Sequence, residues 1–395
     1  MEAAYIVDAV RTPVGKAPRG VFSATRPDDL LVHVLRGLLA RNAALDPGAV
    51  GDVICGCAMP EAEQGLNVAR IALLLAGLPE TVPGVTVNRF CASGLEAVAI
   101  ASDRVRSGQA DIAIAAGVES MSLVPMGGNR PAYNLRIFED DQVGIAYGMG
   151  ITAEIVAERF AVDREAQDAF ALESHRRALA ARERGEFDAE ILPVEVVHRV
   201  PDPAQAVCVE RRRAISHDEG PRADTSLEAL ARLRPVFAAK GTVTAGNSSQ
   251  RSDGAAAVLV ASERGLRRFG LQPRARFLGY TVVGVAPEVM GIGPIEAIPR
   301  VLERIGLKLE QMDWIELNEA FAAQSLAVIA KLGLPRERVN PLGGAIALGH
   351  PLGATGAIRT ATLVHGLQRH GRRYGMVTMC VGTGMGAAGV FEAVG

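Results

Sequence analysis

The chain has 395 residues, enough for two or three domains, and its 42 Lys and Arg against 44 Asp and Glu give a formal net charge of −2. That balance argues against a nucleic-acid binder, which carries a basic footprint, and against a polybasic membrane anchor. With 49% apolar and 22% charged residues the chain is not disordered, and 43 glycines with only 4% aromatic residues indicate an aliphatic core with many tight turns.

The cysteine content and the N-terminus indicate a reduced compartment. Five cysteines are too few for a disulfide scaffold in a chain of this length: Cys55, Cys57, Cys91, Cys208 and Cys380. The first residues hold neither a basic region nor a long apolar run, so we expect no secretory signal and a cytoplasmic location. Residues 339–358 are uncharged over a membrane-spanning length, but their glycines and prolines predict a buried segment of a globular protein, not a membrane span.

The first part of the chain alternates strand and helix patterns. We expect strands at residues 3–10, 52–57, 85–87 and 111–116, and helices at residues 28–42, around 71–75, and at 93–107. One face of the first helix gathers Leu31, Val34, Leu35 and Leu38, and Gly77 is expected to end the second helix. The alternation predicts a mostly parallel sheet.

The composition changes between about residues 121 and 242. Arginine and glutamate become dense, as in residues 158–186 and 211–213, and strand signals fade. We expect a polar, partly helical insertion outside the core. Two interpretations stay open for it, a solvated cover or a lid that binds substrate through cationic side chains.

After residue 242 the α/β pattern resumes and repeats the first half. The sequence GLP ends an apolar helix at residues 77–79 and again at 333–335, and VN follows at 87–88 and at 339–340. A glycine-rich turn then opens a helix in each half, and one turn carries Cys91 while the other carries His350. We therefore expect two similar α/β halves related by a pseudo-twofold axis, with these two residues facing one pocket.

Cys91 is the strongest candidate nucleophile. It lies between an expected strand and an expected helix, where free N–H groups at the helix start favour a thiolate and the turn exposes the side chain. A buried structural cysteine is an equal alternative on this segment alone. Cys55 and Cys57 lack a histidine or a second cysteine pair at ligand spacing, so no metal site is expected.

Three more positions are candidates for chemistry. His350 is held between glycine and proline, with a helix-capping turn histidine as the alternative. Asn318 follows an expected strand, where α/β folds place functional groups, and its alternative is a helix N-cap. Cys380 opens the run CVGTGMG; too few residues follow for these glycines to open a helix, so a dinucleotide site is rejected in favour of a tight turn with N–H groups facing a pocket.

Several motifs together resemble the thiolase family. They are VNRFCASGLEA at residues 87–97, NEAFA at 318–322, NPLGGAIALGHPLGATG at 340–356 and CVGTGMGAA at 380–388, joined by AGNSSQRSDGAAA at 245–257 and MGIGP at 290–294. The resemblance covers essentially the whole chain. It implies a thiolase-like α/β fold: an N-terminal half at residues 1–117 with 244–270, an inserted loop domain at 118–243 and a C-terminal half at 271–395.

Within that family the chain looks like the degradative 3-ketoacyl-CoA thiolases of fatty-acid β-oxidation. The biosynthetic branch typically has His-Met-Gly in the insertion, where this chain has Gly148-Met149-Gly150. The resemblance implies an acyltransferase that cleaves 3-ketoacyl-CoA with CoA, reversibly, through an acyl-Cys91 intermediate. CoA is then a co-substrate, and no metal or redox cofactor is needed.

The resemblance also implies a role for each candidate. His350 takes the proton of Cys91, and His350 with a water held by Asn318 stabilises the thioester oxygen of the leaving enolate. Cys380 is the general acid and base of the two half-reactions. The N–H groups of Cys91 and Gly382 form a second oxyanion hole.

Six positions match family contacts to CoA or substrate. Ser249 and Met290 correspond to contacts near the pantetheine and Arg222 to one near the nucleotide, with a surface arginine as an equal alternative; the others are Phe237, Phe321 and Met149. The family implies a homodimer or homotetramer and allows a partner in a β-oxidation multienzyme complex.

Other functions remain as alternatives. One is an acetyl-CoA acetyltransferase that makes acetoacetyl-CoA, and another is a non-catalytic relative that binds acyl-CoA or lipid, although Cys91, His350 and Cys380 are all present. A decarboxylating ketoacyl synthase is rejected, because Asn318-Glu319 stands where that class has a histidine motif and the C-terminal turn carries Cys380.

Overall fold

The computed structural model describes residues 2–139, 142–202 and 207–394. The strands are β1 (Ala4–Arg11), β2 (Gly15–Lys16), β3 (Asp52–Gly56), β4 (Gly84–Val87), β5 (Ile112–Ser120), β6 (Val194–Asp202), β7 (Val207–Ile215), β8 (Ser252–Ala261), β9 (Ala275–Gly284), β10 (Trp314–Leu317), β11 (Tyr374–Val381) and β12 (Met385–Ala393). The helices are α1 (Pro27–Arg41), α2 (Val68–Ala76), α3 (Ser93–Arg106), α4 (Arg136–Glu139), α5 (Met149–Arg159), α6 (Arg164–Glu183), α7 (Leu227–Ala231), α8 (Glu263–Phe269), α9 (Gly293–Ile305), α10 (Ala322–Leu332), α11 (Ala345–Leu348) and α12 (Leu352–Arg369).

The strands of the two halves take matching places in the sheet, counted inward from its two edges. The strand order runs β4-β3-β5-β8-β1 through the first half and β9-β12-β11-β10 through the second, where a parallel bridge from Ile315 to Val339 takes the place of a strand matching β4. The halves join where Ala4–Ile6 of β1 pair with Ala275–Phe277 of β9. The expectation of two similar mixed-sheet α/β halves is confirmed.

The expectation of a mostly parallel sheet is wrong. Among the described strands of the sheet, β3 pairs in parallel with β4 and β5 and β10 pairs in parallel with β11, while the ladders formed by β1, β8, β9 and β12 are antiparallel. In the second half the reason is local. Only the tight turn at Gly382–Gly384 separates β11 from β12, and such a short connection can join only antiparallel neighbours.

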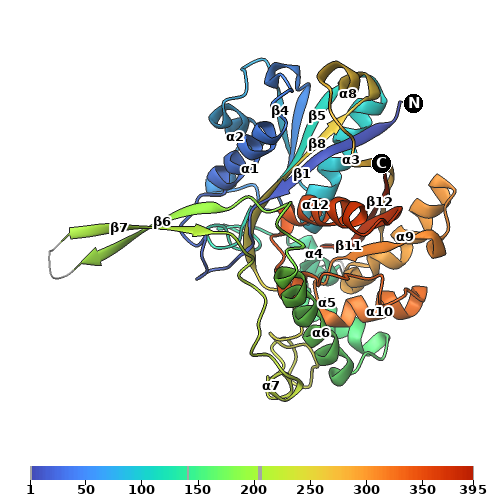
Figure 1. The fold of residues 1–395 in the computed structure, drawn as a ribbon. Helices are drawn as coiled ribbons and strands as arrows, with labels where there is room; N and C mark the ends of the chain where they lie inside the picture. The colour runs from blue at the N-terminus through green and yellow to red at the C-terminus, as the bar shows by residue number, and fades with distance from the viewer. Residues whose placement is uncertain (1, 140–141, 203–206, 395) are drawn as a thin grey trace.

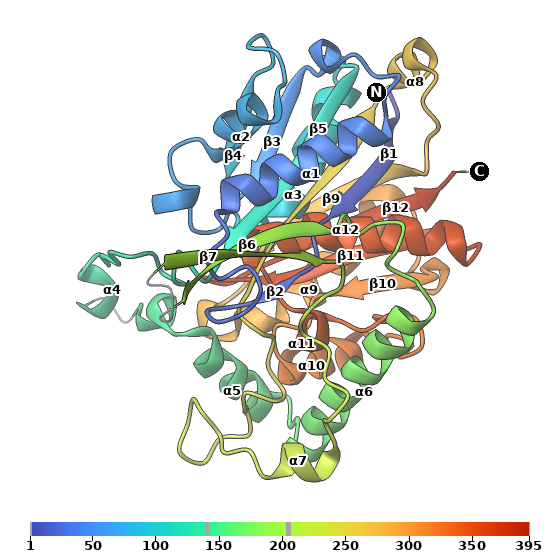
Figure 2. The ribbon, with the colours of Figure 1, turned by 60° about the vertical axis from the view of Figure 1, so that its left-hand side comes forward.

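Three apolar clusters define the layers of the molecule (Figures 1 and 2). One contains α3 and α12 and the inner face of the sheet in both halves. The second joins α1 and α2 to the outer face of the first half of the sheet, and the third joins α9 and α10 to the outer face of the second half. The central helix α12 is accordingly buried on all sides from Leu352 to Leu367, so the uncharged segment at residues 339–358 lies in the interior as expected. Among the helices the structure describes, none is long and apolar enough to cross a membrane.

The two central helices approach each other unusually closely. A Cβ added at Gly94 of α3 would lie 2.6 Å from the backbone nitrogen of Ala357, and one at Gly356 of α12 would lie 2.1 Å from that of Leu95. Glycine at both positions is therefore what lets α3 and α12 touch backbone to backbone. Because each helix starts at one of the two glycine-rich turns, this contact also brings the turns together.

Local signals placed most core elements correctly. Helix α1 begins with Pro27 and has Asp28 and Asp29 in its first turn, the residue types that suit a helix N-terminus. Its expected apolar face is buried, and Gly77 ends α2 in the left-handed conformation, with φ of +93°.

The insertion is partly helical, as expected, but it also contains two strands that the sequence does not predict. It contains α5, α6 and α7, but also the paired strands β6 and β7, which project from the body as a hairpin (Figure 1). The expectation that strand signals end there was wrong. Since Val207, Val209 and Arg211–Arg213 are all exposed, β7 lacks the alternation of buried and exposed residues by which strands are recognised.

Candidate active site

Cys91 lies in the sharp connection between β4 and α3. It follows Phe90, whose φ of +43° is a left-handed conformation that a bulky residue rarely adopts, and the strain indicates a tightly determined turn. The residue as a whole is 7% exposed. Burial raises the pKa of Cys91 to about 11, although the N–H groups of Gly382 and of Cys91 itself point to the sulfur and lower it.

His350 lies in the matching turn of the second half, just before α12. Its backbone N–H donates to Ser252 Oγ at 3.1 Å, and its ring Nδ1 lies 2.7 Å from Thr355 Oγ1. Burial, with the charge of Arg359 in a smaller role, lowers the pKa of His350 to about 3. The imidazole is therefore neutral at physiological pH.

The Cys91 thiol and the His350 imidazole are thus both neutral in the resting state. The expectation that the helix start would favour a Cys91 thiolate does not hold for this state, because the loss of hydration on burial outweighs the two N–H groups. Sequence patterns report the helix start but not the depth of burial.

Asn318 follows β10 directly and reaches the histidine. Its Nδ2 lies 3.3 Å from His350 Nε2, and its buried Oδ1 accepts no hydrogen bond from any residue that the structure describes. The N-cap of α10 is Phe321, so the alternative of Asn318 as a helix cap is excluded. If its amide donates to Nε2, the imidazole proton is on Nδ1 and is shared with Thr355.

Cys380 is the fully buried seventh residue of β11, two residues before Gly382. Burial, followed by the nearby Cys91 sulfur, raises the pKa of Cys380 well above its usual range. Gly384 has φ of +86°, and a Cβ there would lie 2.3 Å from the carbonyl oxygen of Val285, so the turn requires glycine. The turn leads into β12, not a helix, and the rejection of a dinucleotide motif is correct.

Cys91 and His350 line one cavity of about 890 Å³. All six candidate contact positions line it as well: Ser249, Arg222, Met290, Phe237, Phe321 and Met149. Asn318, Cys380 and Gly382 do not line the cavity themselves. Asn318 contacts the lining residue His350, while Cys380 and Gly382 lie next to the lining residue Cys91.

The wall of the cavity is apolar near the thiol and charged elsewhere. Met121 and Leu352 pack with Cys91, and the rings of Phe237 and Phe321 meet edge to face at 6.1 Å. The charged side chains along the wall are Lys16, Arg222, Asp224 and Arg251, and the neutral imidazole of His175 lies among them. Arg222 lines the cavity but is exposed and lies 3.1 Å from Asp224, so the nucleotide contact and the surface arginine both stay open.

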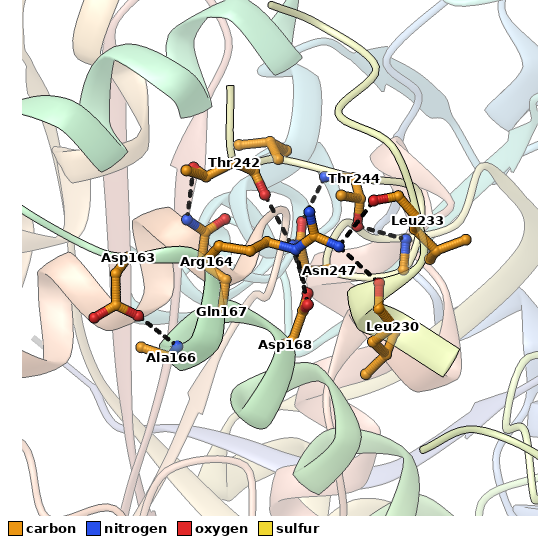
Figure 3. Close-up of polar contacts among 12 residues, drawn as sticks. Asp163, Arg164, Ala166, Gln167, Asp168, Leu230, Leu233, Thr242, Thr244 and Asn247 are labelled. Atoms are coloured by element: carbon orange, nitrogen blue, oxygen red, sulfur yellow. Dashed lines mark hydrogen bonds and ion pairs between the residues drawn. The ribbon is translucent and has the colours of Figure 1, made fainter. Parts of the chain in front are cut away.

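The insertion supplies much of this wall, and a polar network fixes it in place (Figure 3). Arg164 of α6 pairs with Asp168 at 2.7 Å and donates to the carbonyl groups of Leu230 and Leu233, both of which line the cavity. Asn247 Nδ2 donates to the other oxygen of Asp168 at 2.9 Å. The network therefore joins α6, α7 and the segment that leads to Ser249, so at this point the insertion is more than a solvated cover.

Sequence reasoning missed several residues of the site. Sequence reasoning did not single out Thr355, whose hydroxyl reaches His350 Nδ1 from the first turn of α12, five residues further along the chain. His175 lines the cavity and accepts a hydrogen bond from the backbone N–H of Arg222, and burial lowers its pKa to about 4. In the described part of the chain, no group of three or more His, Cys, Asp or Glu side chains is arranged to hold a metal ion.

Comparison with known proteins gives consistent matches along the whole chain. Residues 4–264 match the N-terminal domain of thiolase, and residues 271–393 match the C-terminal domain. The chain is 50% identical over 393 residues to a 3-ketoacyl-CoA thiolase of Bacillus subtilis (strain 168), covering 99% of this chain and 100% of that one. It is 48% identical over 407 residues to a beta-ketoadipyl-CoA thiolase of Pseudomonas aeruginosa, with 99% of each covered. The crystal structure of the Bacillus anthracis acetyl-CoA acetyltransferase matches with a TM-score of 0.89 and 40% identity, covering 100% of this chain and 99% of that one.

Proposed function

Because the chain belongs to the thiolase family, we propose that it is a 3-ketoacyl-CoA thiolase, which uses CoA to cleave 3-ketoacyl-CoA into acetyl-CoA and a shortened acyl-CoA. The observation that carries this proposal is the meeting of Cys91 and His350 in one cavity, with Cys380 adjoining the thiol. A relative that only binds acyl-CoA would have no need for two buried thiols beside a neutral histidine.

The first half-reaction breaks a carbon–carbon bond. His350 takes the Cys91 proton as the sulfur attacks the 3-keto carbon, and the N–H groups of Cys91 and Gly382 stabilise the resulting oxyanion. Since a resting thiolate is disfavoured here, proton transfer and attack occur together. The negative charge then develops on the oxygen of the 3-keto group, where the N–H groups of Cys91 and Gly382 stabilise it.

Collapse of that oxyanion expels acetyl-CoA as an enolate. The bonding electrons move onto the enolate oxygen, near protonated His350 and a water held by Asn318, whose Oδ1 has no other partner among the described residues. Cys380 gives its proton to the enolate carbon, which releases acetyl-CoA and leaves Cys91 acylated.

The second half-reaction returns the protons. The Cys380 thiolate removes the proton of an incoming CoA thiol, whose sulfur attacks the acyl carbon on Cys91. The Cys91–acyl bond breaks, the shortened acyl-CoA leaves, and His350 returns its proton to the Cys91 sulfur. Both thiols are then as they began, and the proposed cycle as written needs no metal or redox cofactor.

The cavity wall suits CoA. In our proposal Ser249 and Met290 contact the pantetheine, Phe237, Phe321 and Met149 pack on it, and Arg222 lies near the nucleotide phosphates. The insertion at residues 118–243 then acts as the cover of the CoA site, between an N-terminal half at 1–117 with 244–270 and a C-terminal half at 271–395.

We also propose that the active form is at least a homodimer. Strand β4 ends the sheet and, in the described chain, pairs only with β3, while Leu74 and Leu75 of the neighbouring α2 are exposed. An open edge strand beside exposed apolar side chains favours pairing with a second copy. Light scattering of the active enzyme tests this, and a fully active monomer would contradict it. The proposed setting is cytoplasmic fatty-acid β-oxidation, in which a multienzyme partner has a place.

Steady-state thiolysis of 3-ketoacyl-CoAs of several chain lengths tests the proposed activity. We expect cleavage of substrates longer than acetoacetyl-CoA, because the wall beside Cys91 is apolar and Gly148-Met149-Gly150 lacks the histidine of the biosynthetic branch. Activity restricted to acetoacetyl-CoA would favour the acetyl-CoA acetyltransferase alternative instead. Loss of thiolysis from every substrate tried would contradict both.

A further inference from the structure

Glu119 is a fully buried carboxylate for which the proposed reaction has no use. It is the next-to-last residue of β5, the strand that leads into the insertion. One of its oxygens accepts hydrogen bonds from the backbone N–H groups of Ala58 and Gly353, both at 2.8 Å. The other accepts from the N–H of Met59 at 3.2 Å and from the side-chain amide of Gln64 at 2.5 Å.

The hydrogen-bond partners of Glu119 favour its ionised form. Three backbone N–H groups and one side-chain amide donate to its two oxygens, so a carboxyl proton would have only the Cys57 sulfur, a weak acceptor at 4.0 Å, to bond with. Burial raises the pKa of Glu119, and these donors oppose that shift. A carboxylate with this many donors is a strong and directional anchor.

The anchor joins the two turns of the active site. Gly353 is in the first turn of α12, three residues after His350, while Ala58 packs with Cys91 and Leu352. A Cβ at Gly353 would lie 2.7 Å from Glu119 Oε2 and from the nitrogen of Ala58, so there is no room for a side chain between these groups. The negative charge also lies at the N-terminus of a long helix, where the helix dipole favours it.

We infer that Glu119 is a positioning residue, whose carboxylate fixes the start of α12, and with it His350, against the Ala58–Met59 segment beside Cys91. The inference rests on the proposed function, since it presumes that His350 and Cys91 act as base and nucleophile. Proton transfer between them depends steeply on their separation, and a misplacement of about 1 Å can cost about 10²-fold in rate.

Two substitutions separate the effect of the Glu119 charge from the effect of its side-chain length. Glu119→Gln keeps the length but removes the charge and turns an N–H group toward donors, and Glu119→Asp keeps the charge but is too short to hold Ala58 and Gly353 together. We expect both to lower kcat for thiolysis by about 10–10²-fold while KM changes little. Asp8→Asn is the matched control, because Asp8 is also a buried carboxylate but holds Arg41, Asn42 and Arg274 away from the site.

Alkylation of Cys91 by iodoacetamide supplies a second readout that a purely structural role would not move in this way. Burial is the main cause of the raised pKa of Cys91 and the charge of Glu119 adds to it, so Glu119→Gln should modestly speed alkylation at pH 8 while slowing turnover. Glu119→Asp should slow turnover without speeding alkylation, and Asp8→Asn should do neither. Thermal unfolding of each variant verifies that it is folded; if Glu119→Gln is not, Glu119→Asp decides the effect on kcat.

The result that overturns the inference is a folded Glu119 variant with the wild-type kcat, or one in which only KM changes. Wild-type thiolysis and acylation of Cys91 are measured first in the same preparation. Their failure would refute the proposed function, whereas an active wild type with unaffected Glu119 variants would refute only the role of Glu119.

Discussion

The two halves of the molecule share a topology and divide the chemistry. Gly56 ends β3 opposite Gly117 of β5, and Leu317 ends β10 opposite Thr378 of β11. Two residues beyond these partners stand Glu119 in the first half and Cys380 in the second, so a structural anchor and a proposed general acid occupy equivalent places. The equivalent turns carry Cys91 and His350.

The comparison shows what the duplicated scaffold provides and what it does not. It provides two strand-to-helix turns, which are brought together because the helices that begin at them, α3 and α12, touch. Side-chain identity then decides which equivalent position binds, reacts or only holds the structure together. Substitution of one member of an equivalent pair, or of a residue that holds it, tests this division.

Replacement of Cys380 should lower turnover most among the substitutions that leave the nucleophile in place. Cys380→Ser keeps the shape but is a far weaker acid, so carbon–carbon cleavage and the exchange of acetyl-CoA α-protons should fall by at least about 10²–10⁴-fold. Exchange in deuterated water, followed by NMR for wild type and variant, measures this. Exchange at the wild-type rate with thiolysis lost would remove Cys380 as the acid and leave His350 as the next candidate.

The pH dependence of Cys91 alkylation should separate a neutral pair from a thiolate–imidazolium pair. With the pKa of Cys91 at about 11 and that of His350 at about 3, the thiolate fraction should rise about 100-fold from pH 7 to pH 9, because it grows tenfold per pH unit below the pKa. The rate is read on the Cys91 peptide by mass spectrometry, in a Cys208→Ser background that removes the exposed thiol. A rate that is already at a plateau at pH 7 would show an ion pair.

Thr355→Val should have a smaller effect, and it tests how His350 is held. Loss of the hydroxyl 2.7 Å from Nδ1 frees the ring to change tautomer and to shift from its position, so we expect kcat to fall by about 10-fold. Thr355→Ser, which keeps the hydroxyl, should restore most of the activity. Equal activity of the valine and serine variants would mean that the hydrogen bond does not orient His350.

Much of the fold could be predicted from the sequence because its signals are local. The face of α1, the glycine that ends α2 and the repeated order of motifs are all short-range patterns, and the repeat alone predicts that Cys91 and His350 share a pocket. The β6–β7 hairpin was missed because its strand β7 is exposed on both faces, so no buried–exposed alternation marks it.

The parts of the site that could not be predicted depend on distant contacts. Glu119 and Gly353 are far apart in the chain, and no local sequence pattern in either segment predicts their hydrogen bond. The protonation state of Cys91 depends on burial, which opposes the helix start that the sequence does reveal. The sequence therefore indicates clearly which residues can react, but it does not indicate their protonation states in the resting enzyme.

Acylation of the enzyme tests the central claim most directly. Wild-type protein and Cys91→Ala are mixed with acyl-CoA in the absence of free CoA, and the intact masses and tryptic peptides are measured. We predict one acyl adduct per wild-type chain, on the peptide that contains Cys91, and neither adduct nor thiolysis in the variant. An adduct on Cys57 or Cys208, or one that persists in Cys91→Ala, would contradict the account.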